Sequence, residues 1–205
     1  AGDLDVNFDG RGYVEDIIGQ LNAFTTRAGE QWTSRTINQE ELKTLLPGIC
    51  LKATSGSDNP ISNYLSMMQG ISFERLHLDF DTSPEEGING EAYLYQMHAD
   101  SLLVDTIGID LKHGEDGLDF LTEVISTAKP NQEAFEVNLA GSIGNGKAQL
   151  LLQYLNARKE KGVYLGVDAA LGRRGIRMKL FPENPILVYR PFHLNPRNYI
   201  YLADR

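Results

Sequence analysis

Cysteine, basic charge and long apolar runs are all scarce in this 205-residue sequence. The single cysteine, Cys50, excludes an intramolecular disulfide framework and any zinc or iron–sulfur site built from several cysteines. The 19 Lys and Arg residues face 28 Asp and Glu residues, and the net charge of -9 makes nucleic acid and anionic membrane surfaces poor partners. No run approaches the ~20 apolar residues of a membrane helix, and the start AGDLDVNFDG has no signal-peptide pattern. We therefore expect any anchor or signal to lie outside this chain, which we interpret as a segment of a longer protein.

Catalytic and metal-binding motifs are also absent. No serine lies in a GxSxG elbow, and Cys50 has no histidine near it in sequence to serve as a base. The alternating acidic residues Asp79 and Asp81 are typical of the solvent-exposed face of a strand. The histidines lack the i, i+4 spacing of a helical metal motif, and we expect each to be solvated or hydrogen-bonded. They are His77, His98, His113 and His193. The sequence thus predicts no enzyme, no metal and no cofactor, with a hydrolytic enzyme as the least favoured alternative.

The glycine-rich stretch GSIGNG at 141–146 raises the question of a phosphate-binding loop. Such a loop follows a strand and opens a helix. Here the apolar residues alternate with period two on both sides of the glycines, and Asn145-Gly146 supplies the positive φ angles of a tight turn. The stretch therefore predicts a β-hairpin.

From residue 71 onward, apolar runs alternate with short polar corners that contain Gly or Pro. No corner is long enough for a parallel crossover, so we expect an antiparallel meander. The predicted strands are 71–81, 88–99, 101–113, 117–126, 133–143, 147–157, 162–172, 174–181 and 185–190.

The first seventy residues follow a different pattern. Residues 4–8 and 49–53 alternate as strands, the second with Cys50 on its other face, and the stretch up to residue 36 is vague strand and loop. Two short helices are expected: one over 39–46, with Asn38 and Glu41 forming a capping box, and one from Pro60 to Gly70.

The second of these helices carries a stripe of apolar residues that we expect to be buried as core. The stripe consists of Ile61, Leu65 and Met68.

The predicted fold is mainly β: a curved antiparallel meander sheet, shaped as a gutter or a half-open sandwich, with two short helices near residues 38–70. Residues 1–205 form a single β-rich segment, in which 1–70 is a strand plus two-helix portion and 71–205 is the meander.

One face of the predicted meander is continuously apolar when the strands are placed in ordinary hairpin registers. Such a face has to be covered by a second sheet, by curling, by helices or by a ligand with hydrocarbon surface, and two short helices are too small for this. The candidate lining residues of a lipid groove are Phe135, Val137, Leu139, Leu150, Leu152, Leu165, Val167, Ile176, Met178 and Leu180.

Two stretches carry a family resemblance: INGEAYLYQMHADSLLVDTI at 88–107 and YRPFHLNPRNYIYL at 189–202. With the rest of the chain from about residue 38, they resemble a segment of the large TamB proteins of Bacteroidetes, which are relatives of AsmA-like envelope proteins. The chain departs from this family in lacking the anchoring helix and the C-terminal region, and in carrying two helices near residues 38–70.

The resemblance implies a periplasmic location, within a protein tethered to the inner membrane by a region outside this chain. It further implies a gutter-shaped sheet whose apolar groove conducts phospholipid acyl chains between membranes or assists outer-membrane protein assembly. The implied partner is an outer-membrane barrel protein of the Omp85 type. The alternative is a β-sandwich binding or adhesion module of the cell envelope, with a sealed apolar face and no lipid path.

Overall fold

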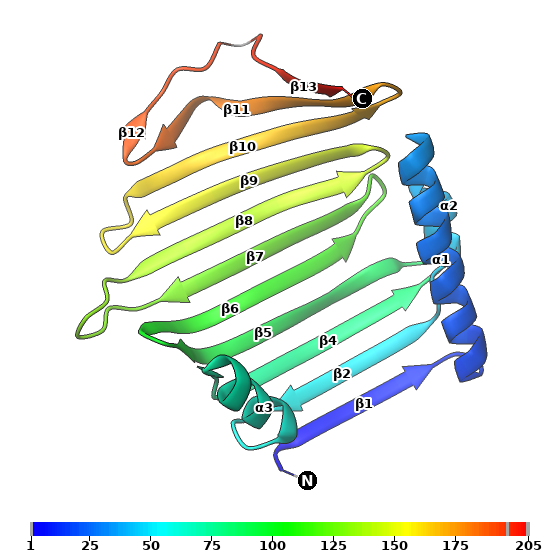
Figure 1. The fold of residues 1–205 in the computed structure, drawn as a ribbon, viewed down its shortest axis with the longest axis horizontal. Coiled ribbons are helices and arrows are strands. Elements are labelled where there is room, and N and C mark those ends of the chain that lie inside the picture. Colours follow the sequence, from blue (N-terminus) through cyan, green and yellow to red (C-terminus); the bar gives the residue numbers. More distant parts are fainter. Residues whose placement is uncertain (1, 196, 204–205) are drawn as a thin grey trace.

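A single open antiparallel sheet of 13 strands forms the body of the protein (Figure 1). The structure is a computed structural model that describes residues 2–195 and 197–203. The strand order is β1-β2-β4-β5-β6-β7-β8-β9-β10-β11-β12, with β13 beside β11 and β3 beside β5. The strands are β1 Leu4–Gly10, β2 Ile49–Ser55, β3 Ile71–Ser72, β4 Arg75–Ser83, β5 Gly87–Ala99, β6 Leu102–His113, β7 Leu118–Ser126, β8 Phe135–Gly144, β9 Lys147–Asn156, β10 Lys161–Gly172, β11 Gly175–Leu187, β12 Arg190–Pro191 and β13 Ile200–Ala203.

The predicted meander is confirmed, including the hairpin at GSIGNG. Asn145 and Gly146 have φ angles of 48° and 73°, and they connect β8 directly to β9. The expected strands 174–181 and 185–190 are instead one strand, β11, which runs to Leu187. Its two internal prolines lack the N–H that a ladder requires, and the β10–β11 register shifts at this point so that pairing resumes beyond them.

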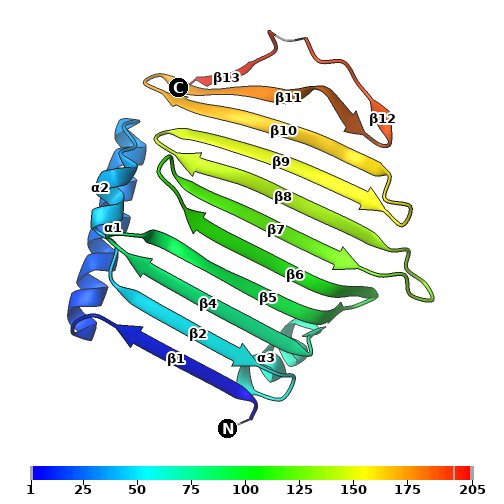
Figure 2. The same ribbon diagram turned by 180° about the vertical axis from the view of Figure 1, so that it is seen from behind.

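The predicted strand over residues 4–8 is confirmed as β1, but the prediction of strand and loop between it and residue 36 was wrong. A helix of 21 residues, α1 (Val14–Ser34), occupies this segment, and it runs along one end of the strands (Figure 2). Two glycines and a mostly polar composition weaken its helical pattern. The residues that face the rest of the protein recur every seven positions, at Ile17, Phe24 and Gln31. This spacing is visible in the sequence only when the polar Gln31 is counted as a buried residue.

The two expected short helices are α2 (Gln39–Thr44) and α3 (Pro60–Gln69). The capping box expected for α2 is only half formed. The Asn38 side chain accepts the Glu41 N–H, but the Asn38 N–H donates to the Gln31 side chain at 2.7 Å. The Gln31 amide in turn donates to Glu41 at 2.9 Å. The buried Gln31 side chain therefore joins α1 to α2, which stabilises the helix pair.

Helix α3 has the predicted ends, with Asn59 as N-cap and Gly70 in the left-handed conformation at its C-terminus. The expected apolar core stripe is wrong, because Met68 and Ile61 are 62% and 46% exposed. What anchors α3 is polar: the buried Asn59 amide donates to the Ser55 hydroxyl at 2.8 Å. The position of α3 thus depends on a cap, with little contribution from apolar packing.

Four sheet glycines each pair directly across strands with an aromatic residue, so that the ring lies over bare backbone. A β carbon on Gly108, for example, would come within 2.6 Å of the Tyr93 ring. This arrangement recovers apolar contact where the glycine side chain is missing. The pairs are Gly90 with Phe80, Gly108 with Tyr93, Gly141 with Phe120, and Gly166 with Phe181.

Substituting alanine for the glycines inside α1 is expected to stabilise the fold. A β carbon at Gly19 or at Gly29 meets nothing within 4 Å. Each change should raise the free energy of unfolding by about 0.5–1 kcal/mol, because alanine loses less backbone entropy in a helix. Urea unfolding of Gly19→Ala measures this, and a lower midpoint than that of the parent would contradict the placement of α1.

Asp105 in β6 ties down the turn after β7, and this predicts an acid-sensitive contribution to stability. The Thr127 N–H and hydroxyl hold the pKa of the Asp105 carboxyl well below its usual range, with help from Lys129 at 3.0 Å. A lowered folded-state pKa contributes stability that is present above the unfolded pKa of about 3.9 and is lost as pH falls through the folded value.

Asp105→Asn is therefore expected to lower the free energy of unfolding by about 1–3 kcal/mol at pH 7. The gap between the variant and the parent should shrink as the pH drops from 4 toward 2. Denaturant unfolding at pH 7 and at low pH gives both values, and an unchanged gap across this range would contradict the assigned hydrogen bonds.

Within the described residues, none of the helices has both the length and the apolar content that a membrane crossing requires.

Candidate functional site

The strand registers divide the sheet into two faces. Directly paired residues in antiparallel strands point to the same side. Leu152 in β9 pairs with Leu139 in β8 and with Leu165 in β10. The same rule, with alternation along each strand, brings all ten predicted lining residues together on one side of the sheet. These are Phe135, Val137, Leu139, Leu150, Leu152, Leu165, Val167, Ile176, Met178 and Leu180.

This side, here called the apolar face, extends well beyond the predicted residues. It continues without interruption through β7, β6, β5, β4 and β2 to β1, so that ten strands contribute to it. The period-two alternation that led to the predicted residues is also present in these earlier strands, and it would have found them. The additional members include Val6, Phe8, Leu51, Leu78, Phe80, Ala92, Leu94, Ile107, Ile109, Leu111 and Val124.

The apolar face is open. In the part of the chain that the structure describes, no second sheet lies against it, so the half-open sandwich is not formed. The total accessible surface is 13345 Å², whereas a folded monomer of this mass exposes about 9,600 Å² by the usual scaling. Leu152, midway along β9 on this face, is 39% exposed. The additional accessible surface is expected for a single-layer sheet, because one of its two sides is not covered by a second layer.

Helices flank the apolar face at both ends of the strands (Figure 1). At one end, the Asn59 cap of α3 bonds Ser55, which pairs with Leu76 on the apolar side. At the other end, α1 and α2 pack near the last residues of several strands and leave a cleft of about 360 Å³. We call this space the helix cleft. Its lining includes Phe24, Trp32, Leu42, Leu118, Ile143 and Ala169.

The helix cleft contains the one histidine that departs from the prediction. Both ring nitrogens of His113 are buried without a hydrogen-bond partner, as is Oε1 of Gln39. Burial, and then the positive charge of Lys43, lower the pKa of His113. The imidazole is therefore neutral near pH 7, with one donor and one acceptor unused. Sequence reasoning missed both side chains, because each is polar in a local pattern that gives no sign of burial.

The other three histidines agree with the expectation. His77 lies on the opposite side of the sheet, 3.3 Å from Glu91. His98 is exposed. The exposed His193 lies 3.2 Å from Asn184.

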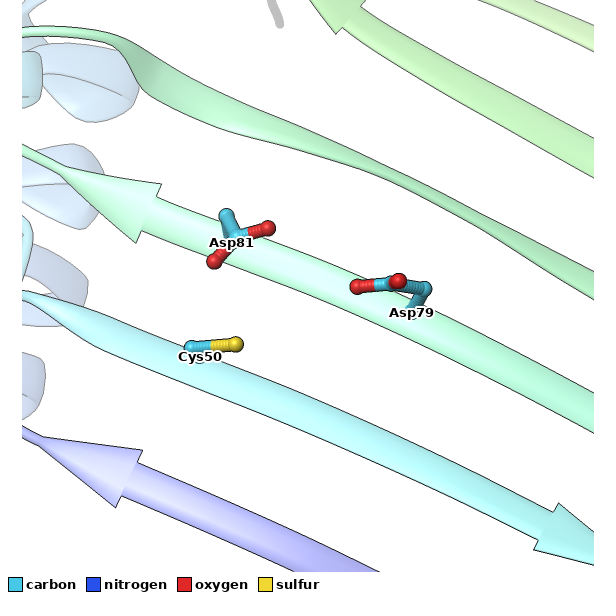
Figure 3. Close-up of side chains that lie close together, drawn as sticks. All are labelled: Cys50, Asp79 and Asp81. Atoms are coloured by element: carbon cyan, nitrogen blue, oxygen red, sulfur yellow. The ribbon is translucent and has the colours of Figure 1, made fainter.

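The opposite side of the sheet is mainly polar and acidic. Cys50, Asp79 and Asp81 lie close together there (Figure 3), with one ligand atom from each within 4.8 Å of the others. The neighbouring Asp81 raises the pKa of the Cys50 thiol, and Asp79 pairs with Lys52 at 2.7 Å. A protonated thiol and a carboxylate already held by a lysine make a poor metal ligand set.

Segregation between the two sides is incomplete, because an apolar stripe also crosses the polar side from β7 to β11. Leu121 in this stripe is 41% exposed. Its members are Leu121, Ala140, Leu151 and Phe181.

No protein-family model, curated protein or solved structure matches this chain. The case for function therefore depends on the geometry of the apolar face and of the helix cleft.

Proposed function

We propose that this chain is a lipid-binding segment whose apolar face carries the acyl chains of phospholipids. The observation that carries the proposal is the uninterrupted apolar side across ten strands, over which the described residues place no second layer. Contact between water and an apolar surface is unfavourable in free energy, and a bound hydrocarbon chain removes that contact.

Hydrocarbon suits the apolar face better than a peptide or a sugar does. The backbone groups of the inner strands are already paired within the ladder, so a ligand that lies on the face gains little from hydrogen bonds. The gain is instead apolar burial, at about 0.8 kcal/mol for each buried methylene. Ten methylenes give roughly 8 kcal/mol before the cost of ordering the ligand, which supports binding of single acyl chains.

The setting that the family resemblance implies is part of the same proposal. The segment belongs to a TamB- or AsmA-like envelope protein of the periplasm, anchored in the inner membrane by a region outside this chain. Its groove serves phospholipid transport between the membranes or outer-membrane protein assembly, with an Omp85-type barrel protein as partner. The continuous apolar side supports this setting, because transport along a sheet requires contact without interruption.

The second candidate, a sealed β-sandwich for adhesion, is less well supported. A sandwich requires a second sheet at ~10 Å from the first. The described residues contribute all their strands to one open sheet.

The proposal is tested by binding a polarity-sensitive fluorescent fatty-acid probe to the purified chain. We expect saturable binding that phosphatidylethanolamine displaces and that soluble sugars leave unchanged. A chain that binds no probe and co-purifies with no lipid would rule the proposal out.

A further inference from the structure

We propose that copies of this chain associate head to tail, with strand β1 of one copy paired antiparallel to strand β11 of the next copy. The inference concerns the two edges of the sheet. It goes beyond the proposed function, because it does not depend on what binds the apolar face.

The outer edge of β1 offers free backbone groups. The Gly56 N–H donates to the Asp3 carbonyl at 3.2 Å, and the Arg11 N–H donates to the Gly48 carbonyl at 2.9 Å. Residues of an antiparallel strand bond alternately to either side, so the odd-numbered residues of β1 bond to β2. The N–H and C=O groups that point outward belong to Leu4, Val6 and Phe8. The described residues place no strand beside them.

The outer edge of β11 is held only by short contacts. The Leu180 N–H donates to the Asn198 side chain at 2.9 Å, which shows that the even-numbered residues of β11 bond outward. Strand β13 pairs with this edge over the four residues Ile200–Ala203, all of which are exposed. Elements with few buried contacts open most easily. A longer strand can therefore take the place of β13.

The two edges match in direction and in the residues that bond outward. Every neighbouring pair along the path from β1 to β11 is antiparallel, and β1 and β11 themselves run in opposite directions. A copy that is shifted along the sheet, without turning over, therefore brings its β1 antiparallel to β11. Even-numbered residues bond outward in both strands, so Val6 can pair with Met178, and both side chains lie on the apolar face. The flanking pairs are Leu4 with Leu180 and Phe8 with Ile176.

The charged side chains of the two strands are complementary in this register. Lys179 comes opposite Asp5. Arg177 comes opposite Asn7 and lies diagonally from Asp9. Within the described residues, none of these four charged side chains takes part in an ion pair. Opposite charges across a strand pair are stabilising, so each strand supplies what the other lacks.

Charge also favours β11 over a second β1 as the partner. Antiparallel pairing of two β1 strands about Asn7 would place Asp5 of one copy opposite Asp9 of the other, and like charges directly opposite are destabilising. The whole chain is polarised in the same sense. Residues 1–144 contain 24 acidic and 8 basic residues, whereas residues 145–205 contain 4 acidic and 11 basic residues. The acidic end of one copy therefore attracts the basic end of the next.

The first experiment measures the mass of the intact chain by analytical ultracentrifugation over a range of concentrations. A mild non-ionic detergent is present to cover the apolar face. We expect oligomers that grow beyond a dimer as the concentration rises, because head-to-tail association is open-ended. High salt should dissociate them by screening the charges. A chain that stays monomeric at every concentration, or that stops at a dimer, overturns the inference.

Two proline variants test which edges take part. Val6→Pro removes an N–H that points away from β2, so the single copy keeps its ladder, and the dissociation constant should rise at least about tenfold. Val6→Ala, the matched control, keeps the N–H and should stay within about threefold of the parent. Leu202→Pro loosens β13 and should tighten association at least about threefold. Unchanged association in either proline variant overturns the inference, and circular dichroism checks that each variant is folded.

Disulfide formation tests the register. In a Cys50→Ser background, Asn7→Cys and Arg177→Cys are placed in separate chains, at positions that face each other in a non-hydrogen-bonded pair, where the β carbons are close enough for a disulfide. We expect an oxidised dimer only when the two chains are mixed. A disulfide dimer of the Asn7→Cys chain alone would show β1 paired with itself. That result, or no disulfide in the mixture, overturns the inference.

Discussion

Leu152→Asp is expected to weaken binding of an acyl chain over β8, β9 and β10 at least about a hundredfold while the protein remains folded. Leu152 lies on the apolar face between Leu139 of β8 and Leu165 of β10. A carboxylate pressed against hydrocarbon costs several kcal/mol, and about 2.7 kcal/mol already corresponds to a hundredfold change in affinity. Because Leu152 is 39% exposed in the free chain, the carboxylate stays hydrated there and the cost to folding is small.

The matched control for this variant is Gln153→Asp, which places the same charge one residue further along β9 on the opposite side of the sheet. Gln153 pairs with Asn138 and Tyr164, and we expect its substitution to leave probe affinity within about twofold, since surface changes are usually small. Fluorescent-probe titration of both variants decides the matter. Equal loss in the two, or in neither, would show that the acyl chain lies elsewhere.

Gly90→Ala is expected to lower the free energy of unfolding by about 2–4 kcal/mol. Gly90 has a φ angle of 154°, which L side chains rarely adopt, and a β carbon there would collide with the Asp79 carbonyl and with the Phe80 ring. The ring can turn aside, but the carbonyl belongs to the paired strand and cannot move without breaking the ladder. Denaturant unfolding monitored by circular dichroism measures the loss.

Gly172→Ala serves as the control, because its β carbon would meet only the Gly175 carbonyl, at an ordinary 3.4 Å. A change within about 1 kcal/mol is expected there, as for other strand glycines without backbone conflict. If both variants unfolded at the same denaturant concentration, the close pairing of β4 with β5 at Gly90 would be refuted.

The hairpins and the segregation of side chains were predictable because each depends on a local signal. Asn145-Gly146 determines a turn whatever its surroundings, and alternation with period two determines which residues share a side. Leu139, Leu152 and Leu165 were therefore placed on one face before any register was known. The caps of α3 at Asn59 and Gly70 were predictable for the same reason.

Features that depend on contacts between distant segments were not predictable. Helix α1 is tied to α2 through the buried Gln31, whose partners lie beyond the helix itself. The apolar stripe of α3 reads as core by its spacing, yet Met68 is 62% exposed because no element of the described chain packs over it. The unpartnered His113 falls in the same class, since its burial is produced by helices that lie far away in the chain.

Whether the apolar side is covered was also beyond sequence reasoning. The same alternation of apolar and polar residues suits a sandwich and an open sheet. Only the strand order, with all described strands in one sheet, separates the two arrangements.

Helices α1 and α2 lie at one end of the strands and α3 lies at the other end beside β3, and between them the apolar face continues crosswise over one strand after another from β1 to β11 (Figure 1). Nine inter-strand steps of ~4.8 Å make this path roughly 43 Å long, which exceeds the ~30 Å hydrocarbon thickness of a bilayer. Under the proposed function, this path has room for two acyl tails end to end, and the segment would bind more than one molecule at saturation. Movement of lipid along the path would then require only that an arriving tail displace the neighbouring tail by one strand spacing.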